Sequence, residues 1–286
     1  MEAALPDTIL EALWRSLGAD PGAARVTPLA GGFTGAAVRR VDLSAGERRW
    51  SVVVKTCDPS EVAVMAAIAP LGGASFPVVL AAGEDWFASP FHDGRDLSFH
   101  DPAPVAVAQD LARLHAAWEG RTPPPGLRRY DAGLVGALLA GARAALDGRP
   151  GLELDEASPL LRIADRLPRT LTHGDVHPGN IIASDDGRFT LIDWGNAASA
   201  PGMLDLANTT PIGAPAWDAY LAAYRAAGGR LSEAAQILAW RWARGVGGLM
   251  YLPWAARRRP DEVAGLVRQA LDADRALAAA GIGPLG

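Results

Sequence analysis

The sequence has very little of what a disulfide-stabilised or membrane-spanning protein needs. Among its 286 residues Cys57 is the only cysteine, so no disulfide can form within the chain and no cysteine-based zinc site is available. The most apolar late stretch, residues 237–256, is interrupted by Arg241 and Arg244, which excludes a membrane span there. The N-terminus lacks the basic-then-apolar order of a secretion signal. These features predict a cytoplasmic protein with no membrane partner.

Lysine is scarce, and the positive charge is almost entirely arginine. The formal net charge is −5, which disfavours nucleic acid as a partner, because nucleic-acid-binding domains are usually basic. Of the 27 basic residues only Lys55 is a lysine, and it ends the apolar run of residues 52–54. Lys55 is either a chance survivor at a strand edge or a residue at a site that needs a compact ammonium rather than a guanidinium fork.

The pattern of secondary structure changes near residue 90. Short β-branched runs at residues 25–29, 36–43 and 48–55 predict a small sheet, with one helix inserted after the third run. Beyond residue 90 the apolar residues recur mostly at helical spacing. The sequence therefore predicts an α+β protein with two lobes, a β-rich lobe at residues 1–90 and a larger helical lobe at residues 91–286.

Two segments carry the strongest chemical signal: residues 171–180 (LTHGDVHPGN) and residues 192–195 (IDWG). Phosphoryl transfer needs a carboxylate to orient a hydroxyl and oxygen ligands to hold magnesium against phosphates. Asp175 and Asn180 are five residues apart across a Pro-Gly turn, as are the corresponding Asp and Asn of protein kinases. Asp193 ends a predicted strand, and the strand–turn–strand between Asn180 and Asp193 is expected to place these two residues side by side.

These two segments resemble the signatures of the aminoglycoside phosphotransferase and choline kinase superfamily, whose members share the protein-kinase fold. The resemblance implies transfer of the γ-phosphoryl group of ATP or GTP, with Mg²⁺, to a hydroxyl of an antibiotic or similar small molecule. It implies that Asp175 is the catalytic base, that Asn180 and Asp193 are magnesium ligands, and that His173 braces the loop.

Other parts of the family pattern follow in order along the chain. Residues 29–35 (LAGGFTG) lie between two predicted strands, where Gly31 and Gly32 would let backbone N–H groups approach phosphates, although a Gly-Gly pair alone is more often a simple turn. The resemblance assigns Lys55 to the α- and β-phosphates. Its expected partner is Glu61, with Asp58 as the alternative.

Two later residues match structural positions of the family. His115 is interpreted as a packing or hydrogen-bonding residue of the helix that follows the interlobe linker. Asp205, in the segment of residues 202–207 (GMLDLA), resembles the aspartate that steadies the catalytic loop.

Two other functions compete with the kinase interpretation. His173, Asp175 and His177 alternate along the chain and could converge on zinc or manganese, which would indicate a metal-dependent hydrolase. That interpretation leaves the glycine loop, Lys55 and Asn180 without a role. A kinase fold that only binds a ligand is disfavoured because no expected catalytic position is missing.

The acceptor is constrained mainly by charge. From residue 200 onward the chain has nine arginines and seven acidic residues, which does not favour a polycationic acceptor. Helical spacing puts Trp240 and Arg244 on one face. They are either a core tryptophan and a solvated arginine or part of a site for a neutral, aromatic or anionic acceptor. The choice between ATP and GTP and the oligomeric state stay open.

Overall fold

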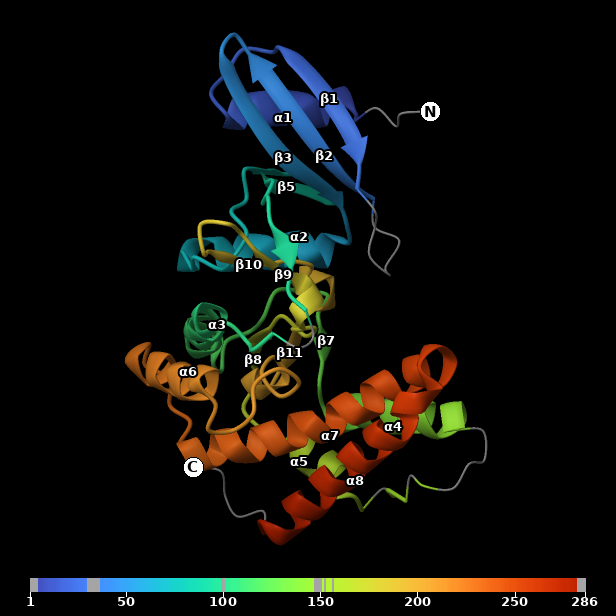
Figure 1. Ribbon diagram of the computed structural model, residues 1–286. Coiled ribbons are helices and arrows are strands. Elements are labelled where there is room, and N and C mark those ends of the chain that lie inside the picture. Colours follow the sequence, from blue (N-terminus) through green and yellow to red (C-terminus); the bar gives the residue numbers. More distant parts are fainter. Residues whose placement is uncertain are drawn as a thin grey trace. The chain divides into compact units, whose positions relative to one another are not determined.

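The computed structural model describes residues 5–29, 37–98, 101–146, 151, 153–155 and 157–281 (Figure 1). The chain divides into two compact units. The described residues of the first unit belong to Met1–Ser98, Pro124–Gly126 and Gly179–Asn196, and those of the second to Phe99–Pro123, Leu127–Pro178 and Ala197–Gly286.

The first unit contains a five-stranded antiparallel sheet in the order β1-β2-β3-β5-β4. Its strands are β1 (Ala23–Pro28), β2 (Val38–Ala45), β3 (Arg48–Thr56), β4 (Ala81–Ala82) and β5 (Trp86–Pro90). The helix α1 (Asp7–Ser16) covers one face of this sheet (Figure 1). Because side chains alternate along a strand, Val41 and Leu43 of β2 and Val52 and Val54 of β3 all point to this face, where they are buried with Leu13 of the helix.

The helix α2 (Pro59–Ile68) and a second, three-stranded antiparallel sheet complete the first unit. This sheet has the order β10-β9-β6, with β6 (Arg95–Asp96), β9 (Ile181–Ala183) and β10 (Phe189–Leu191). The predicted division at residue 90 assigns residues 179–196 to the second part of the chain, whereas the structure groups them with the first unit. The physical reason is backbone pairing: β9 pairs with β6, and the amide of Leu191 donates to the carbonyl of Ser75 at 2.8 Å.

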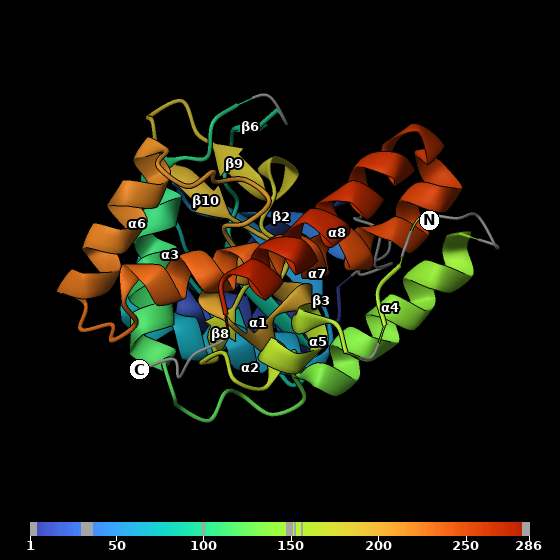
Figure 2. The ribbon, with the colours of Figure 1, turned by 90° about the horizontal axis from the view of Figure 1, so that it is seen from below.

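The second unit is mainly helical. Its helices are α3 (Val105–Trp118), α4 (Ala132–Leu146), α5 (Pro159–Ala164), α6 (Pro215–Ala226), α7 (Glu233–Arg258) and α8 (Val263–Ala279). The long helix α7 packs along α8 and α4 (Figure 2), and α3 packs on α6. Gly248 makes the close approach of α7 to α8 possible, because a Cβ atom there would lie 2.8 Å from the carbonyl oxygen of Leu266.

A small sheet in the order β7-β11-β8 lies within the second unit. Its strands are β7 (Arg128–Arg129), β8 (Thr170–Thr172) and β11 (Ala198–Ala200). Short 3₁₀ turns are found at Ala69–Leu71, Pro178–Asn180, Trp194–Asn196, Gly202–Leu204 and Pro260–Glu262. Within the described part of the chain, no helix combines the length and the apolar character that crossing a membrane requires.

Candidate active site

Lys55 is the centre of a buried ion cluster in the first unit. It lies on β3, and its Nζ is 2.7 Å from Oε1 of Glu61 and 2.7 Å from Oδ1 of Asp193. Glu61 is in the first turn of α2, and its carboxylate faces Lys55 on β3. Asp58 instead forms the N-cap of α2, and its side chain accepts the amide of Ser60 at 2.8 Å. Glu61, and not Asp58, is therefore the partner of Lys55 on α2.

The charges of this cluster explain its ionisation. Burial alone would lower the pKa of the Lys55 ammonium, but the carboxylates of Glu61 and Asp193 outweigh burial and raise it. Lys55 is therefore charged at neutral pH. Burial raises the pKa of Glu61, and the nearby negative charge of Asp193 acts in the same direction. With all three groups ionised, one ammonium faces two carboxylates and the cluster has a net charge of −1.

Asp193 has an unusual backbone conformation. Among the described residues it is the one non-glycine residue with a positive φ, 63°. Aspartate tolerates this left-handed conformation better than most residues, and such outliers are concentrated at functional sites. The next residue, Trp194, anchors the turn: it is buried, its Nε1 donates to the carbonyl of Leu191 at 3.0 Å, and its ring packs edge-on against Phe76. Gly195 leaves room for the Glu61 carboxylate, because a Cβ atom at this position would lie 3.2 Å from Oε2 of Glu61.

Asn180 reaches the same region through the β9–β10 hairpin. The amide of Ile192 donates to the carbonyl of Asn180 at 2.8 Å, which places Asn180 and Asp193 at adjoining ends of the two strands, as the sequence predicts. Asn180 is buried. An amide oxygen and a carboxylate are ligands that Mg²⁺ prefers, and a divalent cation would compensate the net negative charge of the neighbouring cluster. The residues present therefore fit a magnesium ion.

A cavity of about 390 Å³ opens beside this cluster, and all of its lining residues belong to the first unit. Lys55, Asn180 and Asp193 supply its polar wall. The remaining lining residues are mostly apolar: Leu29, Val38, Val53, Pro77, Phe87, Ser89, Pro90, Phe91, His92, Asp96, Gly179, Ile182, Ile192 and Trp194. Gly31 and Gly32, the predicted phosphate loop, lie outside the described residues.

In the second unit, Asp205 holds the segment that carries Asp175. Its Oδ2 accepts the amide of His173 at 2.8 Å, and its Oδ1 accepts the amide of Gly174 at 2.8 Å. Nε2 of His115 lies 3.1 Å from Oδ2 of Asp205. Asp205, His115 and His173 are all buried. The prediction that Asp205 steadies this loop and that His115 is a hydrogen-bonding residue is confirmed.

We expect Asp205→Ala to lower the free energy of unfolding by about 3–5 kcal/mol, because two buried backbone donors and one imidazole lose a charged partner. Urea unfolding measures this loss. The matched control is Asp218→Ala, an exposed acid on α6, which should change the free energy by less than about 0.5 kcal/mol. An effect of Asp205→Ala as small as that of the control would contradict the bracing role.

Asp175 is held from two sides. Its amide donates to Nδ1 of His173 at 3.2 Å, which agrees with the predicted bracing by His173. Its carboxylate Oδ1 accepts a hydrogen bond from the phenol of Tyr251, on α7, at 2.9 Å. Sequence reasoning missed Tyr251, because it lies 76 residues away in an apolar helical stretch without a motif. Helical spacing from Arg244, two turns earlier, is the one signal that could have pointed to it.

The alternative metal site is not formed. His173, Asp175 and His177 are all described, and no group of three or more His, Cys, Asp or Glu side chains in the described part of the chain is placed to hold a metal ion. His173 is fully buried, and its Nδ1 is engaged by the amide of Asp175. The hydrolase interpretation has no support from this geometry.

The fold and the site define the class of the protein. It is an α+β protein in which a lysine on a strand pairs with a glutamate on the following helix and with an aspartate at the end of another strand. The family model for the phosphotransferase enzyme family, APH, matches residues 25–246. The chain belongs to this family of phosphotransferases. No curated protein matches this sequence.

Solved structures confirm the protein-kinase-like α+β fold. A macrolide 2'-phosphotransferase from Brachybacterium faecium is 19% identical with a TM-score of 0.52, over 92% of this chain and 98% of that one. A choline kinase from Cryptosporidium parvum is 12% identical with a TM-score of 0.58, over 98% of each chain. An aminoglycoside phosphotransferase from Alicyclobacillus acidocaldarius is 17% identical with a TM-score of 0.53, over 98% and 96%.

Proposed function

We propose that this phosphotransferase moves the γ-phosphoryl group of ATP or GTP, with Mg²⁺, to a hydroxyl of a small molecule. The observation that carries the proposal is the ion cluster at the cavity. The one lysine of the chain is held between two carboxylates beside a cavity large enough for a ligand of nucleotide size. A purely structural lysine would not need two acidic partners, one of them buried, next to a cavity.

The side chains at the ion cluster of the first unit have separate roles. Lys55 contacts the phosphates, and Glu61 fixes the direction of its ammonium. Asn180 and Asp193 would hold Mg²⁺, which neutralises phosphate charge and orients the triphosphate. The net charge of −1 in the cluster would repel a free triphosphate, so nucleotide binding is expected to depend strongly on Mg²⁺. Gly31 and Gly32 are assigned to the phosphates on sequence grounds.

Asp175, five residues before Asn180 on the same loop, is the proposed base. It orients the acceptor hydroxyl and takes its proton while the acceptor oxygen forms a bond to the γ-phosphorus. The bond from the γ-phosphorus to the bridging oxygen breaks, and the nucleoside diphosphate leaves with that electron pair. His173 holds the backbone of Asp175 in place. A cytoplasmic location accords with the use of ATP or GTP.

The test is magnesium-dependent consumption of ATP and GTP by the purified protein against a panel of hydroxyl compounds. Each compound should be assayed with and without excess EDTA. Turnover that one acceptor stimulates and EDTA abolishes would support the proposal. If neither nucleotide binds in the presence of Mg²⁺, measured by calorimetry, the proposed function is wrong.

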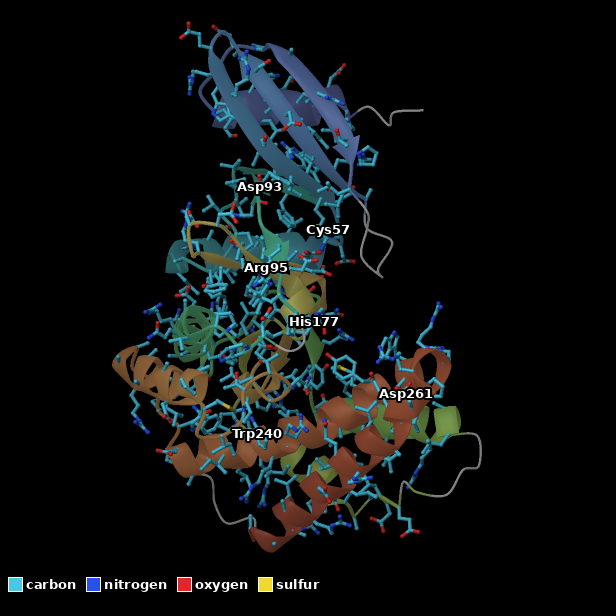
Figure 3. All side chains as sticks on the ribbon, viewed as in Figure 1. Cys57, Asp93, Arg95, His177, Trp240 and Asp261 are labelled. Carbon is cyan, nitrogen blue, oxygen red and sulfur yellow. The ribbon has the colours of Figure 1, made fainter. Side chains whose placement is uncertain are left out.

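We propose that the acceptor is neutral, aromatic or anionic, and α7 supports this. Trp240, on α7 (Figure 3), is half-buried and donates from Nε1 to the carbonyl of Thr210 at 2.9 Å. The guanidinium of Arg244 lies 5.7 Å from the centre of the Trp240 ring. This face presents an aromatic ring and a positive charge, which suits an uncharged ring or an anion better than a polycation. Choline is a cation and aminoglycosides are polycations, so this proposal differs from the acceptors for which two of the similar structures are named.

We expect Trp240→Ala combined with Arg244→Ala to raise the Michaelis constant of the acceptor at least about tenfold, because a stacking contact and a charge are lost together. The Michaelis constant of the nucleotide should stay within about twofold. Arg241→Ala, on a neighbouring face of α7, is the matched control. An unchanged Michaelis constant of the acceptor in the double variant would show that the acceptor binds elsewhere.

A further inference from the structure

The last turns of α7 carry an exposed tryptophan close to the segment that holds Asp175. We propose that Trp254 is a binding residue for the acceptor: its indole stacks on a flat, uncharged ring of the acceptor, whose hydroxyl then reaches Asp175. This inference rests on the proposed function, because it takes Asp175 as the base. It concerns a different residue and the affinity for the acceptor, so the two can fail separately.

Trp254 differs from the other tryptophans in its exposure. All nine tryptophans of the chain lie among the described residues, and Trp254 is the one that is exposed, at 39%, whereas the others are buried or half-buried. Burial of an indole is strongly favourable, so an indole in solvent gives up stability. Single exposed apolar side chains are nevertheless common, so exposure alone does not define a site. The position of Trp254 on α7 supplies the second observation.

A hydrogen bond from the same helix face locates Trp254 relative to Asp175. Tyr251 is three residues before Trp254, and side chains three residues apart are neighbours on the surface of a helix. The phenol of Tyr251 donates to Oδ1 of Asp175 at 2.9 Å, and the side chain of Asn208 hydrogen-bonds to the same phenol. Trp254 is only about 4.5 Å further along the helix axis than Tyr251. An acceptor whose hydroxyl contacts Asp175 is therefore within reach of the indole.

The residues around Trp254 on α7 favour an apolar ring over a cation. Met250 and Tyr251, one turn earlier, are half-buried, and Sδ of Met250 accepts a hydrogen bond from the phenol of Tyr130 at 3.3 Å. Arg258, one turn later, is exposed on the same side of the helix. The thioether and the two aromatic rings form an apolar surface that suits stacking, and the guanidinium disfavours a positively charged acceptor.

Trp254 and Trp240 would make separate contacts with an acceptor. Trp240 is eleven residues before Tyr251, which is about 16 Å along the axis of α7. Only a large acceptor could contact Trp240 while its hydroxyl reaches Asp175, whereas contact with Trp254 needs no such length. We therefore expect a small ring-bearing acceptor to depend on Trp254 alone and a large one to depend on both tryptophans.

The first experiment needs no turnover. The full-length protein is labelled with 5-fluorotryptophan, and the fluorine NMR signal of Trp254 is assigned by its disappearance in Trp254→Phe. We expect 2-phenylethanol and uridine, two uncharged ring-bearing alcohols, to shift this signal saturably, and choline, a cation without a ring, to leave it in place. The signal of Trp118, half-buried on α3, is the internal control. A Trp254 signal that moves no more than that of Trp118, or that moves with choline, overturns the proposal.

The second experiment measures turnover with MgATP and whichever compound stimulates it most among 2-phenylethanol, uridine, choline and kanamycin. We expect Trp254→Ala to raise the Michaelis constant of the acceptor at least about tenfold, because a stacking contact is lost. Trp254→Phe should raise it by no more than about threefold, because the smaller ring can still stack. The Michaelis constant of the nucleotide should stay within about twofold in both variants. Trp118→Ala, which removes a half-buried indole from α3, is the matched control and should leave the acceptor constant within about twofold.

The outcomes separate this inference from the proposed function. An acceptor constant in Trp254→Ala equal to that of the wild type overturns the role of Trp254, and so does choline or kanamycin as the best acceptor. If Asp175→Asn keeps wild-type turnover, the proposed base is wrong. If Asp175→Asn is inactive and Trp254→Ala has a normal acceptor constant, only the role of Trp254 is wrong. If no compound stimulates turnover, the fluorine titration alone decides the role of Trp254.

Discussion

Asp175→Asn is expected to lower kcat by about a thousandfold or more, with little change in nucleotide affinity. The amide keeps the size of the side chain and can still accept the hydrogen bond of Tyr251, but it cannot take the proton of the acceptor hydroxyl. Both the catalytic proton transfer and the orientation of the nucleophile are lost, and each contributes to the rate. Steady-state kinetics of nucleotide consumption with a stimulating acceptor measures the effect.

The control for this variant is Asp185→Asn, in the exposed turn between β9 and β10. It makes the same chemical change on the same stretch of chain and should leave kcat within about twofold, as surface substitutions usually do. Thermal unfolding of both variants should be close to that of the wild type. Near-normal turnover of Asp175→Asn would remove Asp175 from the mechanism.

Lys55→Met should reduce both activity and stability. The variant leaves Glu61 and Asp193 facing each other without a cation, and breaking a buried ion pair by removing one partner typically costs about 3–5 kcal/mol. Loss of the phosphate contact should lower kcat/KM for the nucleotide by at least about a hundredfold. Urea unfolding and initial rates at varied nucleotide concentration measure the two effects.

The stability loss in Lys55→Met should depend on pH in a defined direction. Burial already raises the pKa of Glu61, and removal of the ammonium raises it further. A carboxyl with a raised folded-state pKa is favourable to folding at low pH, where it is protonated, and becomes unfavourable as the pH rises through that pKa. The difference in unfolding free energy between wild type and variant should therefore be smaller at about pH 4, near the ordinary carboxyl range, than at about pH 7.

The matched control is the double variant Lys55→Met with Glu61→Gln. It removes one positive and one negative charge together, so most of the lost stability should return while the activity stays low. If the double variant is as unstable as Lys55→Met alone, the cost comes from packing rather than from the unpaired carboxylate. A Lys55→Met enzyme with wild-type kcat/KM would exclude Lys55 from nucleotide binding.

Local patterns were sufficient for much of the first unit. The alternation of valines before Lys55 indicated a strand, and in the structure Val52 and Val54 are buried under α1. The choice of Glu61 over Asp58 could not be made from spacing, because both acids lie within the start of one helix. It was decided by the first turn of α2, in which Asp58 caps the helix and Glu61 projects toward β3.

Longer-range contacts were beyond sequence reasoning. The sequence placed residues 179–196 with the helical part of the chain, because they follow a helical stretch. In the structure β9 pairs with β6. These two strands are far apart in the chain, and no local sequence pattern predicts that they pair. The hydrogen bond from Tyr251 to Asp175 is of the same kind. It depends on how the long helix α7 packs. The spacing of apolar residues in a helix does not predict which single polar side chain will form a long-range hydrogen bond.

The residues that carry the chemistry are visible along the chain: one lysine, two short motifs that each contain an aspartate, and an asparagine at the spacing of the family, which together predict phosphoryl transfer. These are properties of residue type and short separation, and they can be read along the chain. The folded structure was needed to show which acid pairs with Lys55, which backbone conformation Asp193 adopts, and which distant side chain donates a hydrogen bond to Asp175. Those choices depend on the packing of elements far apart in sequence, because burial and backbone pairing select one partner among several that local spacing allows.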